Sequence, residues 1–433
     1  MGVENNIPEG WMEKNLESVI ELIIDHRGKT PKKLGGDWST EGYRAVSAKT
    51  VKNGRLINED KMNILPKDLY HKWMKCEIEF GDVLLTSEAP LGEHMIWKSK
   101  EKIVLSQRIF GIRTDSEILN PAYFNYFIDS RFFQHELKSR ESGSTVTGIK
   151  QSELLKTKLI FPPLKEQKAI AKVLTAFDDK IELLQAQNKT LETMAQTIFK
   201  EWFGKYQIGD ELPEGWRVTN INEFIESSIG GDYGKETTEG DYTEETICLR
   251  GTDLPDMKTG TPKKAPIRFL KASKLERCKV ENGDIVIEIS GGTENQSTGR
   301  VMYINERILS SANHPMTCVN FCRIIRPLKL GYSYFLYSLF DYLYTRKVFF
   351  NWENGTTGIK NLNLKALLED FDLFIPENGD LILDFNKNVK ASFNKIQTNN
   401  SQIQSLTKTR DTLLPKLMSG QVRVNNIKQT ADA

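Results

Sequence analysis

The sequence contains an internal duplication, and this duplication limits the folds that the chain can adopt. Four short motifs of the first half return in the same order in the second half. The motifs and their second copies are Pro-Glu-Gly-Trp at 8–11 and 213–216, Gly-Asp-Val at 81–83 and Gly-Asp-Ile at 283–285, Thr-Gly-Ile-Lys at 147–150 and 357–360, and the helical stretches around Thr197 and Thr412. The distance between the copies far exceeds the roughly 20 to 50 residues of solenoid repeats. We therefore expect two copies of one domain, in a chain whose 433 residues are enough for several cores.

Each copy begins with short β-type runs and closes with a long helical pattern. The runs at 82–86 and 284–289 are rich in Val, Ile and Leu and are bounded by Gly, Pro, Asn and Ser. The first helix is expected to begin after Phe161-Pro162-Pro163, because proline is tolerated in a first helical turn but not inside a helix.

Apolar residues in the first helix recur at alternating spacings of four and three, a heptad pattern typical of a coiled-coil seam. Asn188 is the polar member of this seam, and such a residue can set the register of a coiled coil. The expected seam of the first helix consists of Ile170, Leu174, Phe177, Ile181, Leu184, Asn188, Leu191 and Ile198. The second helix continues the seam less regularly with Val389, Phe393, Ile396, Ile403, Leu406 and Leu413.

Two long amphipathic helices in one chain are each other's most economical partners. We therefore predict an α+β protein with two duplicated mixed α/β domains, joined by two long antiparallel coiled-coil helices and related by a pseudo-two-fold axis. The predicted boundaries are a first domain at 1–163, a central helix at 164–205, a second domain at 206–380, a C-terminal helix at 381–420 and a tail at 421–433.

The charge balance alone does not indicate a nucleic-acid binder. The chain has 59 Lys and Arg against 58 Asp and Glu, for a formal net charge of +1. A DNA-binding chain of this composition must gather its basic groups on one face of each domain, or take part of its phosphate contacts from a partner. The mean hydropathy is −0.44, and the most apolar stretch, 332–344, is too short to span a bilayer. We expect a cytoplasmic protein without a membrane partner.

Several motifs have a structural interpretation that we favour over a catalytic one. Asn120-Pro-Ala-Tyr123 is similar to the Asn-Pro-Pro-Tyr tetrad of amino-methyltransferases, but it fits a helix N-cap followed by proline better. Gly28-Lys-Thr30 lacks the leading glycine of a P-loop, and Pro255-Asp256 lacks the Glu-x-Lys of a nuclease metal site. The five cysteines are scattered, which favours reduced thiols over disulfides or zinc. We expect no catalytic residue, no metal site and no cofactor site in this chain.

Three stretches together resemble the specificity subunits of type I restriction-modification systems. They are Phe161-Pro-Pro-Leu-Lys-Glu-Gln-Lys-Ala-Ile-Ala171, Thr197-Ile-Phe-Lys-Glu-Trp-Phe203 and Leu413-Leu-Pro-Lys-Leu-Met-Ser-Gly420. The resemblance covers essentially the whole chain, including the order domain, helix, domain, helix. The second copy departs from it, because Ile375-Pro-Glu-Asn-Gly379 replaces the Pro-Pro-Leu-x-Glu-Gln opening.

The resemblance implies that each domain is a target recognition domain that reads one half of a bipartite DNA site, while the helices set the spacer. It also implies two methyltransferase subunits, which methylate adenine N6 with S-adenosylmethionine, and motor-nuclease subunits that use ATP and Mg²⁺. These cofactors are expected on the partner subunits.

Base reading requires Arg or Lys for guanine, Asn or Gln for adenine and acidic groups for cytosine, with Gly, Ser and Thr loops near the phosphates. Loops of this composition occur at corresponding places in both copies. The candidate DNA contacts of the first copy are Arg27, Lys29, Thr30, Arg44, Lys49, Thr86, Ser87, Glu88, Arg108, Ser144, Thr145, Thr147 and Lys150. Those of the second copy are Tyr233, Lys235, Arg250, Thr252, Asp253, Ser290, Thr293, Asn313, His314, Thr356, Thr357 and Lys360.

Two other functions remain open from the residues alone. The chain could be a self-sufficient DNA methyltransferase or restriction nuclease, which cofactor binding by the isolated chain would reveal. It could also be a coiled-coil scaffold that does not bind DNA, which a duplex-binding experiment with and without a methyltransferase partner would distinguish.

Overall fold

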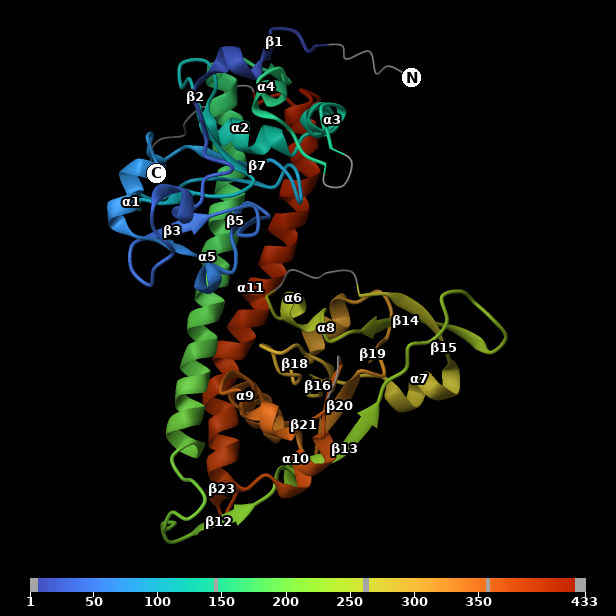
Figure 1. Cartoon of the computed structure of the whole chain (residues 1–433). Coiled ribbons are helices and arrows are strands. Elements are labelled where there is room, and N and C mark those ends of the chain that lie inside the picture. The colour runs from blue at the N-terminus through green and yellow to red at the C-terminus, as the bar shows by residue number, and fades with distance from the viewer. Residues whose placement is uncertain (1–6, 144–146, 260–264, 356–358, 425–433) are drawn as a thin grey trace, which may run out of the picture. The chain divides into compact units, whose positions relative to one another are not determined.

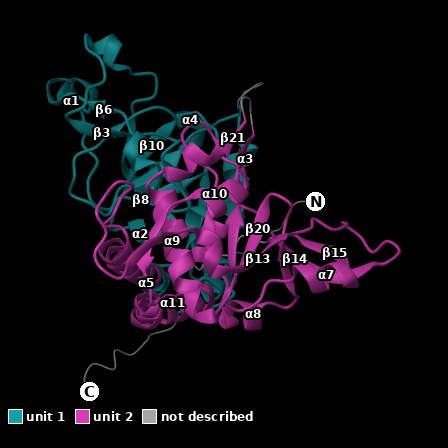
Figure 2. Cartoon of the chain, turned by 90° about the horizontal axis from the view of Figure 1, so that it is seen from below, with its two compact units in different colours: residues 1–179, 407–433 teal, residues 180–406 magenta. Residues whose placement is uncertain are grey.

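The computed structural model describes residues 7–143, 147–259, 265–355 and 359–424. The chain divides into two compact units, Met1–Asp179 with Thr407–Ala433, and Lys180–Leu406 (Figure 2). Both are mixed α and β, and two long helices, α5 (Leu164–Phe203) and α11 (Asp380–Met418), each contribute residues to both units (Figure 1).

Unit 1 is built on a four-stranded antiparallel sheet with the strand order β2-β10-β7-β8. A smaller sheet has the order β6-β3-β9, in which β3 is antiparallel to β6 and parallel to β9. Strands β1 and β11 form an antiparallel pair next to the start of α5. The strands of unit 1 are β1 (Met12–Asn15), β2 (Ile20–Asp25), β3 (Tyr43–Val46), β4 (Val51–Lys52), β5 (Arg55–Leu56), β6 (Ile64–Leu65), β7 (Val83–Thr86), β8 (His94–Ile96), β9 (Val104–Leu105), β10 (Ile109–Thr114) and β11 (Lys158–Phe161), and its short helices are α1 (Lys67–Trp73), α2 (Pro121–Ile128), α3 (Arg131–Ser139) and α4 (Gln151–Leu154).

Unit 2 repeats the main sheets of unit 1 in the same strand order, but among the described residues it lacks the β4-β5 pair of unit 1 and has an additional three-stranded sheet, β17-β22-β21. Its four-stranded sheet has the order β13-β20-β16-β18, its three-stranded sheet has the order β15-β14-β19, and β12 pairs with β23. As in unit 1, one pair of the three-stranded sheet is antiparallel and the other, β14 with β19, is parallel. The strands of unit 2 are β12 (Trp216–Thr219), β13 (Ile225–Gly230), β14 (Tyr242–Leu249), β15 (Ile267–Lys271), β16 (Ile285–Glu288), β17 (Ser290–Gly291), β18 (Val301–Tyr303), β19 (Met316–Cys318), β20 (Cys322–Pro327), β21 (Glu353–Asn354), β22 (Lys360–Leu362) and β23 (Leu373–Pro376), and its short helices are α6 (Leu254–Lys258), α7 (Ala272–Cys278), α8 (Glu306–Ser311), α9 (Ser333–Thr345) and α10 (Leu364–Asp370).

The repeated Gly-Asp motif has a structural cause in both units. Asp82 is buried, and its carboxylate accepts two hydrogen bonds from the Arg113 guanidinium, each 2.9 Å long. In unit 2 the buried carboxylate of Asp284 accepts the corresponding pair from Arg326 at 3.0 and 2.9 Å. Each carboxylate also accepts from a backbone N–H three residues earlier, so one side chain fixes a turn and joins it to the neighbouring central strand.

The start of α5 is fixed by a fully buried side chain, Gln167. Its amide nitrogen donates to the carbonyl oxygens of Pro162 and Ile118 at 2.9 and 3.0 Å, and its amide oxygen accepts from the N–H of Asn120 at 2.8 Å. The Asn120 side chain in turn accepts from the N–H of Tyr123 and caps α2, with proline at the first helical position. The N-cap interpretation of Asn120 is confirmed.

In unit 1, the first part of α5 packs against the last part of α11. Ile170 and Leu174 on α5 belong to the same buried cluster as Leu417 and Met418 on α11, with Leu413 partly buried against it. Arg410 of α11 donates to Asp178 of α5 at 2.6 Å.

In unit 2, the rest of α5 packs antiparallel to the first part of α11. Asn188 contacts Asn399, whereas Phe203, further along α5, lies against Phe385, earlier in α11. The expected seam residues that are buried here are Ile181, Leu184, Asn188, Val389, Phe393, Ile396 and Ile403, while Leu191, Ile198 and Leu406 are partly buried. Phe177, in unit 1, is also partly buried.

The seam changes its composition near the end of α5. Phe199 and Phe203 are buried there, although the heptad assignment omits both and selects Ile198. Their rings lie 5.8 and 4.9 Å from the ring of Phe335 on α9, so this part of α5 packs against α9 as well as against α11. Within the described ranges, none of the helices is both long and apolar enough to cross a membrane.

Candidate functional site

The loops of unit 1 that follow strands β2, β7 and β9 meet the segment around Ile149. The carbonyl oxygen of Arg108 accepts from the N–H of Ser87 at 2.8 Å, and the carbonyl of Ser87 accepts from the N–H of Ile149 at 2.9 Å. The Arg27 guanidinium donates to the Ile149 carbonyl at 3.1 Å. Three loops and the segment around Ile149, all distant in sequence, are thus joined by hydrogen bonds, and we call this group the unit 1 loop cluster.

A fourth loop joins the cluster through β3. The N–H of Ala48 donates to the carbonyl of Gln107 at 3.2 Å, which brings the segment at 47–49 beside Arg108. Lys49, Thr147 and Lys150 are exposed in these segments, whereas Ser144 and Thr145 lie outside the described residues.

The charged groups of the cluster are held in defined positions. Arg27 is bound to the Asp25 carboxylate at 2.9 and 2.7 Å, and its guanidinium lies 4.2 Å from the centre of the Phe110 ring. Arg108 has a positive φ of 65° and forms an ion pair with Glu88 at 3.0 Å, with 42% of its side chain exposed. A cation and a carboxylate are therefore presented together by two loops that a backbone hydrogen bond joins, where a base edge could replace either partner.

Other expected contacts of the first copy are engaged elsewhere. Arg44 lies at the start of β3, where its guanidinium binds the carboxylates of Glu59 and Glu101. The Lys29 ammonium donates to the carbonyl of Trp73 at the end of α1, and burial followed by the nearby Lys75 lowers its pKa. Thr30 caps a short helix, and Thr86 and Ser87 are buried.

The loops of unit 2 gather around the turn formed by residues 318–321. The N–H of Asp232 donates to the carbonyl of Cys318 at 2.8 Å, and the N–H of Val319 donates to that of Leu249 at 2.9 Å. The N–H of Ser290 donates to the carbonyl of Phe321 at 3.2 Å. These bonds place the expected loops at 230–235, 250–253 and 290–294 together, and we call this group the unit 2 loop cluster.

The side chains of the unit 2 loop cluster form several ion pairs. Arg250 binds the buried Asp253 at 2.8 Å, and Lys360 binds Glu353 at 3.2 Å. Lys360 belongs to the cluster because it pairs with Gly291 across β17 and β22. The remaining expected contacts of this cluster are Tyr233, Lys235, Thr252, Ser290 and Thr293. The Tyr233 hydroxyl accepts a hydrogen bond from Arg268, and Lys235 forms an ion pair with Glu239. Thr252 and Thr293 are exposed.

Two expected contacts of the second copy lie at the other end of β19. Asn313 and His314 precede this strand, whereas the unit 2 loop cluster lies at its Cys318 end. His314 forms an ion pair with Glu245 at 3.3 Å. Thr356 and Thr357 lie outside the described residues.

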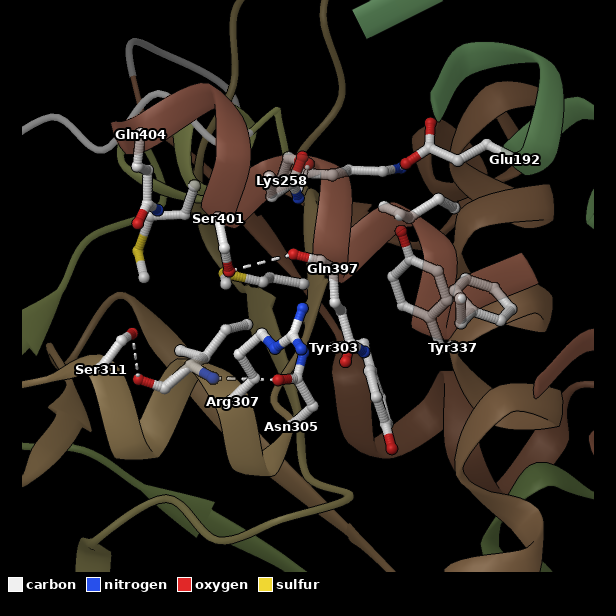
Figure 3. A pocket seen from close by; sticks show the side chains of 16 residues that line it. Glu192, Lys258, Tyr303, Asn305, Arg307, Ser311, Tyr337, Gln397, Ser401 and Gln404 are labelled. Carbon is white, nitrogen blue, oxygen red and sulfur yellow. Dashed lines mark hydrogen bonds and ion pairs between the residues drawn. The ribbon is translucent and has the colours of Figure 1, made fainter. Parts of the chain in front are cut away.

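Unit 2 also contains a cavity of about 70 Å³ between α6, α8, β18 and the helix pair (Figure 3). Lys258 lines it and donates to Asp341 at 2.8 Å, with Glu192 at 3.9 Å. Burial lowers the pKa of Lys258, but Tyr337, Asp341 and Glu192 outweigh burial and raise it well above the ordinary value. Asn400 of α11 donates to the backbone carbonyl of Lys258 at 3.1 Å. These polar groups therefore attach α6 to α5 and α11 within unit 2.

The cysteines are free thiols in the described part of the chain, and four of them, Cys248, Cys278, Cys318 and Cys322, are buried. Burial raises the pKa of Cys248 and of Cys318 to about 12. Among the described residues, no group of three or more His, Cys, Asp or Glu side chains is arranged to hold a metal ion.

Known proteins resemble this chain in sequence and in fold. A family model described as "Type I restriction modification DNA specificity domain" matches residues 8–193. The type I restriction enzyme MjaIX specificity subunit of Methanocaldococcus jannaschii is 26% identical over 97% of this chain and 95% of its own length. The type I restriction enzyme HindI specificity subunit of Haemophilus influenzae is 22% identical over 87% of this chain and 94% of its own. The chain is therefore similar to type I restriction-modification specificity subunits over nearly its whole length, and residues 8–193 match their DNA specificity domain.

A solved structure has a similar fold. The type I restriction-modification S subunit from M. genitalium superposes with a TM-score of 0.55 at 18% identity, over 96% of this chain and 98% of that chain. The family model ends before the second copy, and the strand order of unit 2 shows that the main sheets of unit 1 are repeated there.

Two residues of the unit 2 loop cluster are absent from the sequence-based list. Phe321 is 57% exposed in the 318–321 turn, and the Arg323 guanidinium lies over Gly230, where an added Cβ would be 2.7 Å from it. The signal that could have found them is their alignment with Arg108 and Phe110 of the first copy.

Proposed function

We propose that this chain is the DNA-sequence-reading, non-catalytic subunit of a type I restriction-modification complex. The observation that carries the proposal is the repeated loop cluster, in which separate loops meet at corresponding places of two sheets with the same strand order. A repeated cluster of cations, carboxylates and hydroxyls suits the direct reading of two base sequences.

Each target recognition domain, at 1–163 and at 206–380, reads one half of a bipartite, asymmetric site. The helices at 164–205 and 381–420 hold the domains apart in a pseudo-two-fold arrangement and so set the spacer between the half-sites. Support for this division comes from the antiparallel packing of α5 and α11 in unit 2, where Asn188 meets Asn399.

Two methyltransferase subunits dock on the helices and methylate adenine N6 with S-adenosylmethionine, and motor-nuclease subunits that use ATP and Mg²⁺ join them. A docking position is available on α5, where the side chains of Leu183 and Met194 are each 51% exposed. Met194 and Ile198 line a shallow groove with Lys189 and three threonines. Exposed apolar side chains on a helix that already buries another face favour a protein partner.

The experiment that tests this function is a map of methylated adenines. The chain is produced with its methyltransferase partner in a host without adenine methylation, and the genome is sequenced for N6-methyladenine. The proposal predicts two short defined sequences separated by a gap of constant length. A single uninterrupted site would contradict it.

The same preparation separates the alternatives. Methyl transfer or cleavage by the highly purified chain alone would indicate a self-sufficient enzyme. Failure of the chain with its partner to bind or modify any duplex would indicate a scaffold.

A further inference from the structure

Arg108 and Phe321 occupy the same position in the two copies of the sheet. Each directly precedes the strand that lies second in its four-stranded sheet, β10 or β20. The carbonyl of Arg108 accepts from the N–H of Ser87 at 2.8 Å, and the carbonyl of Phe321 accepts from the N–H of Ile289, also at 2.8 Å. The backbone therefore presents the two side chains from equivalent, anchored turns.

The side chains at this position differ in chemistry. Arg108 is a cation paired with Glu88, whereas Phe321 is a phenyl ring with 57% of the residue exposed. The Phe321 carbonyl accepts a second hydrogen bond, from the N–H of Ser290 at 3.2 Å. The turn that carries the ring is therefore fixed on the loop that follows β16.

Two residues further along each strand, the aromatic side chain is in unit 1 and the cationic side chain is in unit 2. In unit 1 it is Phe110, which is fully buried beneath the Arg27 guanidinium. In unit 2 it is Arg323, which pairs with Gly230 across β13 and β20 and extends over that glycine. The aromatic and the cation have thus changed places between Arg108-Ile-Phe110 and Phe321-Cys-Arg323.

Arg323 has a property that suits a ligand contact. Within the described ranges its guanidinium makes no hydrogen bond or ion pair, whereas Arg250, Arg300 and Arg326 in the same unit each bind a carboxylate. A guanidinium two residues along the chain from an exposed phenyl ring suits the surface of a duplex, where phosphates border base edges. In the major groove, the apolar group on a base edge is the 5-methyl of thymine.

We propose that Phe321 contacts the 5-methyl group of a thymine in the second half-site and that Arg323 binds a phosphate beside it. Arg108, at the equivalent position, reads the first half-site by hydrogen bonding. The two copies therefore select different bases with one backbone position. This inference rests on the proposed function and names a specificity-determining residue within it.

The test uses the complex of the full chain with its methyltransferase partner and duplexes that contain the mapped site. Each thymine of the second half-site, on either strand, is replaced singly by deoxyuridine, which lacks only the methyl group. The wild-type complex is expected to lose about fourfold in affinity at one position, the equivalent of one buried methyl group. Phe321→Ala should bind that substituted duplex and the unmodified duplex equally well, and Phe321→Leu should retain part of the difference.

Leu328→Ala is the matched control, because Leu328 follows the other end of β20 and is 52% exposed. This variant should keep the wild-type response to deoxyuridine. The inference is overturned if Phe321→Ala retains that response, if the second half-site contains no thymine, or if Phe321→Ala loses its methyltransferase partner instead. A bipartite methylation map combined with any of these results rejects the inference alone, whereas a map without two half-sites rejects the proposed function itself.

Discussion

Asn188 and Asn399 form a buried amide pair between the two long helices of unit 2. The Nδ2 of Asn399 donates to the Oδ1 of Asn188 at 2.9 Å, and the Nδ2 of Asn188 donates to Asn400 at 2.7 Å. Asn399 is fully buried and Asn188 is 6% exposed. A shift of α5 along α11 would break both hydrogen bonds, so the pair fixes the register of the helices.

Asn188→Leu is expected to destabilise the chain by about 1 to 3 kcal/mol, because it leaves the Asn399 amide buried without its partner. The double variant Asn188→Leu with Asn399→Leu should recover most of this loss, since two apolar side chains replace both polar groups. The measurement is the urea midpoint of each variant. A double variant less stable than the single would show that the amides stabilise the helix pair rather than select its register.

Asp82→Asn should destabilise unit 1 by about 3 kcal/mol, because the buried side chain at position 82 loses the negative charge that binds the Arg113 guanidinium. Asp284→Asn should destabilise unit 2 by a similar amount, because it removes the negative charge that binds Arg326. Hydrogen exchange resolved by peptide measures each unit, and each substitution should increase exchange in its own unit.

The controls for these substitutions are Glu79→Gln and Glu281→Gln. Glu79 and Glu281 bind the same arginines at 2.8 and 3.3 Å but are largely exposed, so their loss should change stability by less than about 1 kcal/mol. Equal effects of Glu79→Gln and Asp82→Asn would contradict the importance assigned to the buried carboxylate.

The stability of unit 1 should depend on pH through His94. Burial lowers the pKa of His94, but the hydrogen bond and charge of Asp129, 3.6 Å away, raise it above the ordinary value of 6.5. A raised pKa in the folded state gives stabilisation that is complete below about pH 6.5 and disappears as pH rises through the raised value.

Asp129→Asn should therefore lower the urea midpoint at pH 6 more than at pH 8.5. A difference from wild type that stays constant over this interval would show that the imidazole does not gain a proton on folding.

Arg108→Gln should reduce binding to the cognate site by about 1 to 3 kcal/mol and relax one position of the first half-site. Arg44→Gln is the control, because Glu59 and Glu101 already hold that guanidinium at the start of β3. Affinities measured for single-base variants of the site at several salt concentrations distinguish base reading from phosphate contact. A uniform loss for all sequences would make Arg108 a phosphate contact.

Local sequence patterns predicted the features that repeat or that have a period. The duplicated motifs correspond to two sheets with one strand order, and the heptads and the Pro-Pro signal correspond to α5 beginning at Leu164. Composition also selected loops that the structure brings together, such as those of Ser87 and Arg108.

Features that depend on distant partners escaped prediction. The ion pair of Arg44 with Glu101 joins residues far apart in the chain, and composition does not reveal it. Phe199 and Phe203 are buried because α9 supplies Phe335, which no helical period reveals. Phe321 is an apolar residue in a turn, and only its equivalence to Arg108 makes it informative.

An exchange of one domain tests most directly the central claim that each domain reads its own half-site. Residues 206–380 are replaced by the corresponding domain of a relative that recognises a different site, with both long helices retained, and methylated adenines are mapped in a host that carries the chimera and its methyltransferase partner. The account predicts that one half-site changes, while the other half-site is unchanged. A change in both half-sites would show that the two domains read DNA through a shared surface and would contradict the account.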